Sequence, residues 1–271
     1  MSTASVINSV QNPLVKAARA LHESGSRKEK KELLVEGVHL IDEAIAAGVE
    51  VKCLFTRCSE SLSEPEVILQ KRVLLRNIPV HTVSEAVLQK ISQSVTPQGV
   101  VAWISMPPWS SARHLSGDMK LLVADRLQDP GNMGTIIRLA KAFAMDALVV
   151  VPGTVDPYNY KVIRASMGAV FSMNILRYEE ALLLSELEQA GIPLLVTASD
   201  GGCTIWDADL RGSWALVIGN ESSGVSAGFL HQAQQVISIP MPGGTQSLNA
   251  ATATAVVLYE AARQHRVAGG S

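Results

Sequence analysis

Short apolar runs alternate with helix-like segments along nearly the whole chain, and this alternation constrains its fold more than any other feature. In the second half, strand candidates lie at 120–127, 147–151, 173–177, 193–198, 214–218 and 235–239. Helical patterns lie between most of them. Strands that alternate with helices favour a mostly parallel sheet with helices on both faces. The pattern therefore predicts an α/β sheet of about six strands.

The first half shows the same alternation on a smaller scale. We expect strands at 33–36, 51–56, 80–83 and 100–105, and helices at 13–21, 38–47, 63–76 and after Ser84. Ser63 is a typical helix N-cap with Pro65 in the first turn, and Gly48 is a typical residue after a helix end. These elements predict a smaller α/β domain.

A segment with two prolines and several small polar residues separates the halves, at 106–118. Such a composition is typical of a linker. The chain of 271 residues is long enough for two ordinary domains. We therefore predict a first domain at 1–106, a linker at 107–119 and a second domain at 120–271.

Composition argues against several classes of protein. The cysteines form no Cys-x-x-Cys pair and the histidines are scattered, which disfavours a metal site and a disulfide framework. No apolar run approaches the ~20 residues that span a bilayer. The start of the chain, Met1-Ser-Thr-Ala-Ser, lacks a signal pattern. We expect a reduced, soluble, cytoplasmic protein without a membrane partner or a metal.

The net charge is −2, so no overall positive field attracts nucleic acid. Residues 16–31 differ, because six basic and two acidic side chains give this segment a local charge of +4. The segment is either a solvated helix face or a contact for an RNA backbone.

Glycine-rich turns follow apolar strands at three places, 129–135, 217–225 and 239–249. Glycine permits a close approach of the backbone to a ligand. The first turn precedes a helical segment that carries Arg138, and the third runs directly into a helical segment at 250–265. The three turns suggest a ligand held by backbone groups.

These turns resemble motifs 1, 2 and 3 of the SpoU-type (TrmH-like) RNA ribose 2′-O-methyltransferases, a family of the SPOUT superfamily. The matching strings are Asp129-Pro-Gly-Asn-Met-Gly-Thr-Ile-Ile-Arg138, Ile218-Gly-Asn-Glu-Ser-Ser-Gly224 and Ile239-Pro-Met-Pro-Gly-Gly-Thr-Gln-Ser-Leu-Asn249. The segment 158–168 resembles the stretch between motifs 1 and 2. Residues 8–13, 36–37 and 99–102 resemble the RNA-binding domain that often precedes the catalytic one.

The resemblance implies S-adenosylmethionine as methyl donor and an RNA ribose as acceptor, with 23S ribosomal RNA favoured over transfer RNA. It also implies a homodimer formed through the second domain, and a trefoil knot in that domain. Periodicity does not predict the knot, since chain connections are normally unknotted.

The resemblance also assigns roles to residues. It implies a cofactor site at Gly219, Ile239, Leu248 and Thr197, and catalytic roles for Asn132, Arg138, Glu221, Ser247 and Asn249. It implies RNA contacts at Arg164 and Ser166, and we expect further ones at Arg27, Lys28 and Lys30. Judged from residue type alone, Ile239 and Leu248 are more often ordinary core residues, and helix capping is the alternative role of the asparagines and Ser247.

Arg138 follows the first turn closely, and a guanidinium near a helix N-terminus suits a phosphate. Because guanidinium stays charged, with a pKa above ~12, it does not act as the base. We expect Arg138 to bind the target phosphate and to stabilise charge developing on the 2′-oxygen. The alternative is a surface arginine with little effect.

Two other functions compete with this one. A dinucleotide-dependent oxidoreductase requires Gly-x-Gly-x-x-Gly after the first strand, and no such string occurs in the chain. A non-catalytic RNA-binding protein is the other alternative, and the intact motifs disfavour it.

Overall fold

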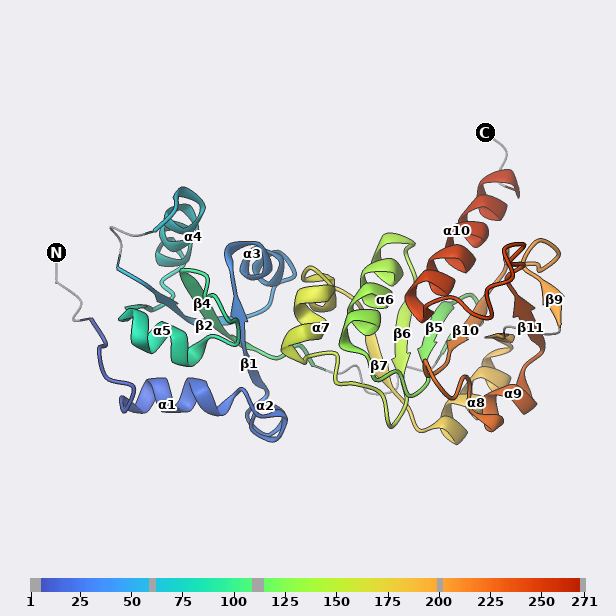
Figure 1. Cartoon of the computed structure of the whole chain (residues 1–271), viewed down its shortest axis with the longest axis horizontal. Coiled ribbons are helices and arrows are strands. Elements are labelled where there is room, and N and C mark those ends of the chain that lie inside the picture. Colours follow the sequence, from blue (N-terminus) through green and yellow to red (C-terminus); the bar gives the residue numbers. More distant parts are fainter. Residues whose placement is uncertain (1–5, 59–61, 109–114, 199–201, 269–271) are drawn as a thin grey trace. The chain divides into compact units, whose positions relative to one another are not determined.

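The computed structural model describes residues 6–58, 62–108, 115–198 and 202–268. The chain divides into two compact units, residues 1–108 and 109–271 (Figure 1). The predicted linker at 107–119 includes this division, and its residues 109–114 lie outside the described residues.

The N-terminal unit is a four-stranded mixed sheet in the order β1-β4-β2-β3. The strands are β1 (Glu32–Glu36), β2 (Val51–Thr56), β3 (Val80–Thr82) and β4 (Val100–Ser105). β4 is antiparallel to β1 and to β2, whereas β2 and β3 are parallel. All four strands lie where the alternation predicts them, within one residue at each end.

Helices cover both faces of this sheet (Figure 1). On one face, α1 (Pro13–Ala20) and α5 (Glu85–Ile91) bury Val15, Leu88 and their neighbours against Phe55 of β2 and Val101 of β4. The other face carries α3 (Val38–Ala46) and α4 (Glu64–Leu75), which contact each other. The short helix α2 (Ser24–Lys30) is not predicted by periodicity, because its sequence has no apolar stripe.

The C-terminal unit is a seven-stranded sheet in the order β7-β6-β5-β10-β8-β11-β9, and every described pair of neighbours is parallel. Its strands are β5 (Lys120–Ala124), β6 (Ala147–Val150), β7 (Ile175–Arg177), β8 (Leu194–Thr197), β9 (Cys203–Thr204), β10 (Trp214–Ile218) and β11 (Gln235–Ser238). The prediction of a parallel α/β sheet is confirmed, and the additional strand is β9, which is too short for periodicity to reveal.

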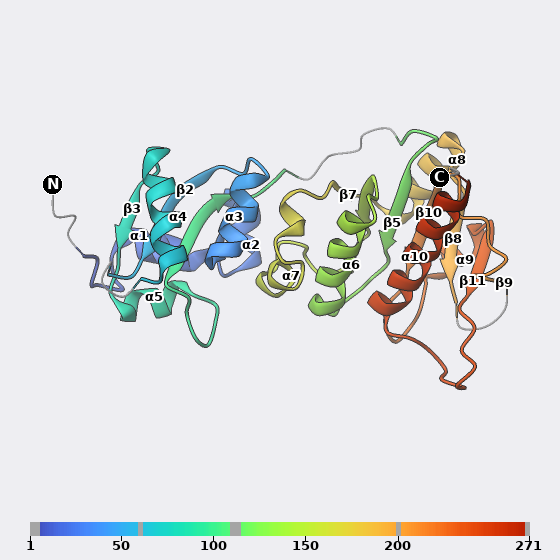
Figure 2. The same ribbon diagram turned by 90° about the horizontal axis from the view of Figure 1, so that it is seen from above.

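Helices also cover both faces of this second sheet, as predicted (Figures 1 and 2). On one face, α6 (Pro130–Ala142) contacts α7 (Tyr160–Ala165) and α10 (Ala250–Ala268). On the other face, α8 (Glu180–Ala190) and α9 (Ala227–Gln232) pack through Leu183, Leu187 and Phe229 on the sheet residues Val123 and Val149.

The strand order determines where ligands can bind. β10 lies between β5 and β8, and β11 lies beside β8. Because the strands are parallel, the loops that follow them emerge at one edge of the sheet, where open α/β sheets bind ligands. These loops include the three glycine-rich turns, after β5, β10 and β11.

Candidate cofactor and catalytic site

A cavity of about 540 Å³ lies at the carboxyl ends of β8, β10 and β11. The second and third glycine-rich turns form most of its wall. All four residues predicted to bind the cofactor line it, namely Thr197, Gly219, Ile239 and Leu248. The predicted strand at 235–239 ends at Ser238, so Ile239 has already left the sheet when it reaches the cavity. Ile239 is half-buried and does not belong to the buried core, which favours the cofactor interpretation over the core one.

The turn after β10 is closed by its own hydrogen bonds. Asn220 and Gly224 exchange two backbone hydrogen bonds of 3.0 Å, and Asn220 Oδ1 accepts from the N–H groups of Ser222 and Ser223. A Cβ atom on Gly219 would lie 2.4 Å from the carbonyl carbon of Gly224. Only glycine fits this position, because real Cβ atoms do not approach backbone so closely.

Three side chains form a hydrogen-bonded row that joins the three turns. Asn132 Nδ2 donates to Glu221 Oε1 at 2.9 Å, and Asn249 Nδ2 donates to Asn132 Oδ1 at 2.7 Å. Glu221 itself lines the cavity, as does Ser247. The structure thus connects Asn132, Glu221 and Asn249 directly, although 117 positions separate Asn132 from Asn249.

Glu221 is held as a carboxylate. Burial alone would raise its pKa, but hydrogen bonds from the Asn132 amide and from backbone N–H groups, including those of Gln128 and Asp129, lower the pKa below its ordinary value. A carboxylate with a lowered pKa is a weak base. It is well suited to fix the orientation of the Asn132 amide, whose oxygen then faces Asn249.

The geometry of the helix caps distinguishes a capping role from a role in the site for each asparagine. Asp129, not Asn132, caps α6, because Asp129 Oδ1 accepts from the Asn132 N–H at 2.7 Å. The cap interpretation of Asn132 is therefore wrong. Asn249 has both roles. Its Oδ1 accepts from the N–H groups of Ala251 and Thr252 at the start of α10, and its Nδ2 donates to Asn132.

Comparison with known proteins agrees with this geometry. Residues 119–259 match the SpoU rRNA Methylase family, and residues 12–102 match the MRM3-like substrate binding domain. The chain belongs to the SpoU rRNA methylase family. The family resemblance stated from the three motifs is confirmed.

Two curated relatives match almost over their full length. The chain is 35% identical to an uncharacterized tRNA/rRNA methyltransferase of Synechocystis, with 95% of this chain and 93% of that protein covered. It is 32% identical to the 23S rRNA (guanosine(2553)-2′-O)-methyltransferase RlmP of Bacillus subtilis, with 93% and 97% covered.

Two solved structures are also similar to this chain over nearly its whole length. An AdoMet-bound rRNA methyltransferase from Sinorhizobium meliloti superposes with a TM-score of 0.84 at 31% identity, covering 96% of this chain and 98% of that one. The SpoU methyltransferase AviRb from Streptomyces viridochromogenes, in complex with the cofactor AdoMet, has a TM-score of 0.80 at 32% identity, with 94% and 98% covered.

Arg138 lies apart from the cavity. It is exposed on α6, it is absent from the cavity lining, and its side chain forms no hydrogen bond or ion pair within the described part of the chain. Asn132 of the same helix is buried. Six helical positions rotate Arg138 away from the face that carries Asn132. The structure of a single chain therefore brings together four of the five predicted catalytic residues.

The predicted RNA contacts fall into two groups. Lys28, Lys30 and Arg164 are exposed, and the Arg164 guanidinium lies over the ring of Tyr160. Arg27 is buried and donates to the carbonyls of Leu21 and His22, at the end of α1. Ser166 is fully buried and donates to Ile163 at the end of α7. Burial leaves Arg27 and Ser166 without surface for RNA, so their prediction disagrees with the structure.

Sequence reasoning did not assign two residues that shape the site. Asn220 lines the cavity and Asp125 is completely buried at the end of β5. Asparagine in a glycine-rich turn is a general signal of a side chain that bonds its own backbone. Nothing in the local sequence marks Asp125, because its partner Ser226 is 101 positions away.

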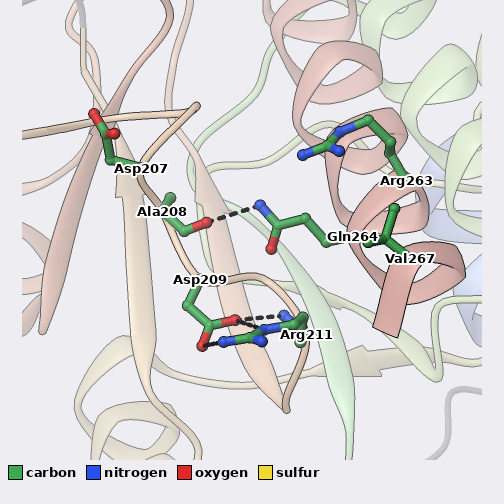
Figure 3. Close-up of a pocket in the computed structure, with 7 residues that line it drawn as sticks. All are labelled: Asp207, Ala208, Asp209, Arg211, Arg263, Gln264 and Val267. Atoms are coloured by element: carbon green, nitrogen blue, oxygen red, sulfur yellow. Dashed lines mark hydrogen bonds and ion pairs between the residues drawn. The ribbon is translucent and has the colours of Figure 1, made fainter. Parts of the chain in front are cut away.

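A second cavity, of about 470 Å³, lies near the other end of α10 (Figure 3). Its walls are the loop at 207–211 and Arg263, Gln264 and Val267. Arg211 is paired with Asp209, and Arg263 with Glu260. This loop leads into the amino end of β10, so the cavity lies at the edge of the sheet opposite the three turns.

Within the described ranges, no group of histidine, cysteine and acidic residues is arranged to hold a metal ion, and no helix is long and apolar enough to cross a membrane.

Proposed function

We propose that this protein methylates a ribose 2′-hydroxyl of 23S ribosomal RNA with S-adenosylmethionine as donor. The observation that carries the proposal is the row Glu221–Asn132–Asn249 beside the cavity at the carboxyl ends of β8, β10 and β11. The names of RlmP and of the AdoMet-bound relatives support both the substrate class and the donor.

The cavity suits an adenosyl group. Its volume lies in the range of small-molecule sites, and its wall combines aliphatic side chains and glycine-rich backbone with polar groups of the two turns. Ile239, Leu248 and Gly219 would hold the adenosine largely through backbone groups, and Thr197 would also line its site. The bound cofactor supplies an electrophilic methyl group on a sulfonium centre.

The polar row orients the acceptor. Glu221 fixes the Asn132 amide, and Asn132 in turn fixes the amide of Asn249. Ser247 and Asn249, at the start of α10, would then position the ribose at the mouth of the cavity. Arg138 binds the target phosphate and stabilises negative charge that develops on the 2′-oxygen, and the proton leaves to that phosphate or to water.

We propose that Arg138 reaches the acceptor in a homodimer formed through the C-terminal unit. α6 and α10 contact each other, and they expose Arg138 and Tyr259, which is 67% accessible. A tyrosine exposed to this degree is typical of an interface residue. Light scattering tests this directly, since Tyr259→Glu is expected to lower the measured mass to that of a monomer, and a dimeric variant would contradict this interface.

We also propose that the C-terminal unit contains the trefoil knot implied by the family. The strand order supports it, because β11 lies beyond β8 whereas α10 returns to pack on α6.

In the N-terminal unit, the exposed Lys28 and Lys30 would hold the RNA backbone by charge, and Arg164 would do the same in the C-terminal unit. We expect the protein to act in the cytoplasm, on its RNA substrate.

Mapping of ribose methylation on total RNA, from cells with and without the gene, tests the function. One 2′-O-methyl site is expected to disappear from 23S rRNA, to return with the wild-type gene and to stay absent with Asn132→Ala. Asn174→Ala is a matched control, because Asn174 lies at the amino end of β7 and is expected to restore the site. A site lost from tRNA would favour the tRNA alternative, and no lost site would favour a non-catalytic RNA-binding protein.

A further inference from the structure

Arg126 adopts an unusual backbone conformation where β5 ends. Its φ angle is +54°, in the left-handed region that residues with a Cβ atom seldom occupy. The predicted strand at 120–127 ends at Ala124 for this reason. Such a conformation persists only where neighbouring groups enforce it, and it often marks a functional position.

Contacts from three sides hold Arg126 in place. Its Nε donates to Oδ1 of the completely buried Asp125 at 3.0 Å, and its carbonyl accepts from Asn220 Nδ2 at 2.9 Å. Its aliphatic stem lies against Gly153, where a Cβ atom would be 3.1 Å from Arg126 Cγ. Asp125 is itself fixed, because its Oδ2 accepts from the Ser226 N–H at 2.6 Å.

The charged end of Arg126 remains available. The side chain is 41% exposed, and Nη1 and Nη2 form no hydrogen bond with any described residue. A guanidinium whose Nε is held by a carboxylate presents its remaining donors as an ordered fork, a geometry that matches phosphate. Arg126 bonds Asn220, and the next residue, Glu221, belongs to the catalytic row.

We propose that Arg126 binds a backbone phosphate of the RNA strand beside the methylated ribose, and that Asp125 orients its guanidinium for this contact. The inference rests on the proposed function, since it places a second phosphate-binding arginine at the edge of the sheet where the ribose is methylated. In the proposed function, RNA is the anion that binds at this edge of the sheet. A phosphate contact positions the RNA strand without reading its sequence.

The test is steady-state methylation of a 23S rRNA fragment by the full chain, with Arg126→Asn as the variant. Asparagine tolerates the left-handed conformation and keeps the carbonyl that holds Asn220, so mainly the charge is lost. The KM for RNA is expected to rise about 5- to 10-fold, with kcat at saturating RNA unchanged within about twofold. The slope of log KM against log salt concentration is expected to fall by about 0.7, the value of one phosphate contact to a single strand.

Arg211→Asn is the matched control. Arg211 is also paired with a nearby aspartate, Asp209 (Figure 3), but it lies at the opposite edge of the sheet, close to the amino end of β10. Its KM and its salt dependence are expected to equal those of the wild type. If Arg126→Asn alone does not fold, because it leaves Asp125 buried without its cation, the double variant Asp125→Asn/Arg126→Asn removes that charge and is expected to show the same rise in KM.

Two results would overturn the inference. Wild-type KM and salt dependence in Arg126→Asn would show that no phosphate is bound there. A fall in kcat with unchanged KM would show that Arg126 only positions the turn after β10. Both results require an active wild-type enzyme, whereas failure of the proposed function would appear as a wild type that transfers no methyl group to RNA.

Discussion

Gly134 of α6 packs closely against α7, and replacing it by alanine tests how tightly this contact positions the catalytic row. A Cβ atom at Gly134 would lie 2.4 Å from Ala165 Cβ and 2.8 Å from both Val162 O and Ser166 N. Two of these neighbours are backbone atoms, which no rotamer change can move aside. Since ordinary contacts begin at 3.4 Å, α7 has to move by about 1 Å relative to α6.

The expected loss of stability is the difference between two effects. Overpacking of this kind costs about 1–3 kcal/mol. Alanine is better than glycine inside a helix by about 1 kcal/mol, which offsets part of that cost. We therefore expect the free energy of unfolding of the C-terminal unit to fall by up to about 2 kcal/mol.

The same shift should reach the site, because Asn132 and Arg138 lie within about one turn of Gly134 on α6. A displacement of 1 Å can reduce the rate by up to about 100-fold, so we expect kcat to fall between about 10- and 100-fold.

Calorimetry can follow the C-terminal unit separately if the two units unfold in distinct transitions, and methyl transfer to an RNA fragment gives kcat. Gly25→Ala in α2 is the matched control, because a Cβ atom there meets nothing within 4 Å. We expect this control to be as stable as the wild type or slightly more so. A Gly134→Ala protein with wild-type stability and kcat would show that the contact between α6 and α7 does not position the catalytic row.

Three further substitutions address the cofactor, the catalytic row and pH. S-adenosylmethionine should raise the melting temperature of the wild type but not of Gly219→Ala, whose Cβ would collide with the turn 2.4 Å away; an equal rise in both would contradict the proposed cavity. Glu221→Gln should lower kcat about tenfold, with little change in cofactor affinity, because a neutral amide holds Asn132 less strongly than a carboxylate does; an unchanged kcat would argue against its orienting role. Burial raises the pKa of Glu66, but hydrogen bonds from Ser63 and the nearby Arg57 bring it below the ordinary 4.5. The contribution of Glu66 to stability is therefore complete above pH 4.5 and is lost as the pH falls through the lowered pKa. The free energy of unfolding should thus fall less steeply with decreasing pH in Glu66→Gln than in the wild type.

Local sequence patterns predict the elements and the chemical parts of the site. Alternating apolar runs predicted nearly every strand to within a few residues, because burial on a sheet leaves a local pattern. The three glycine-rich turns and their polar residues were recognisable for the same reason, since each is a short contiguous string. Periodicity does not reveal β9, which is two residues long, or α2, which has no apolar stripe.

Which of these parts meet depends on how distant segments of the chain pack in the fold. Strand order is a matter of pairing between distant segments, and periodicity carries no information about it. The insertion of β10 between β5 and β8 is what allows Glu221 to reach Asn132, and the return of α10 to α6 brings Asn249 to the same amide. The fold also buries Arg27 and Ser166, whereas Lys28, Lys30 and Arg164 are exposed. Residue type alone does not show this difference, because an arginine or a serine can be buried or exposed.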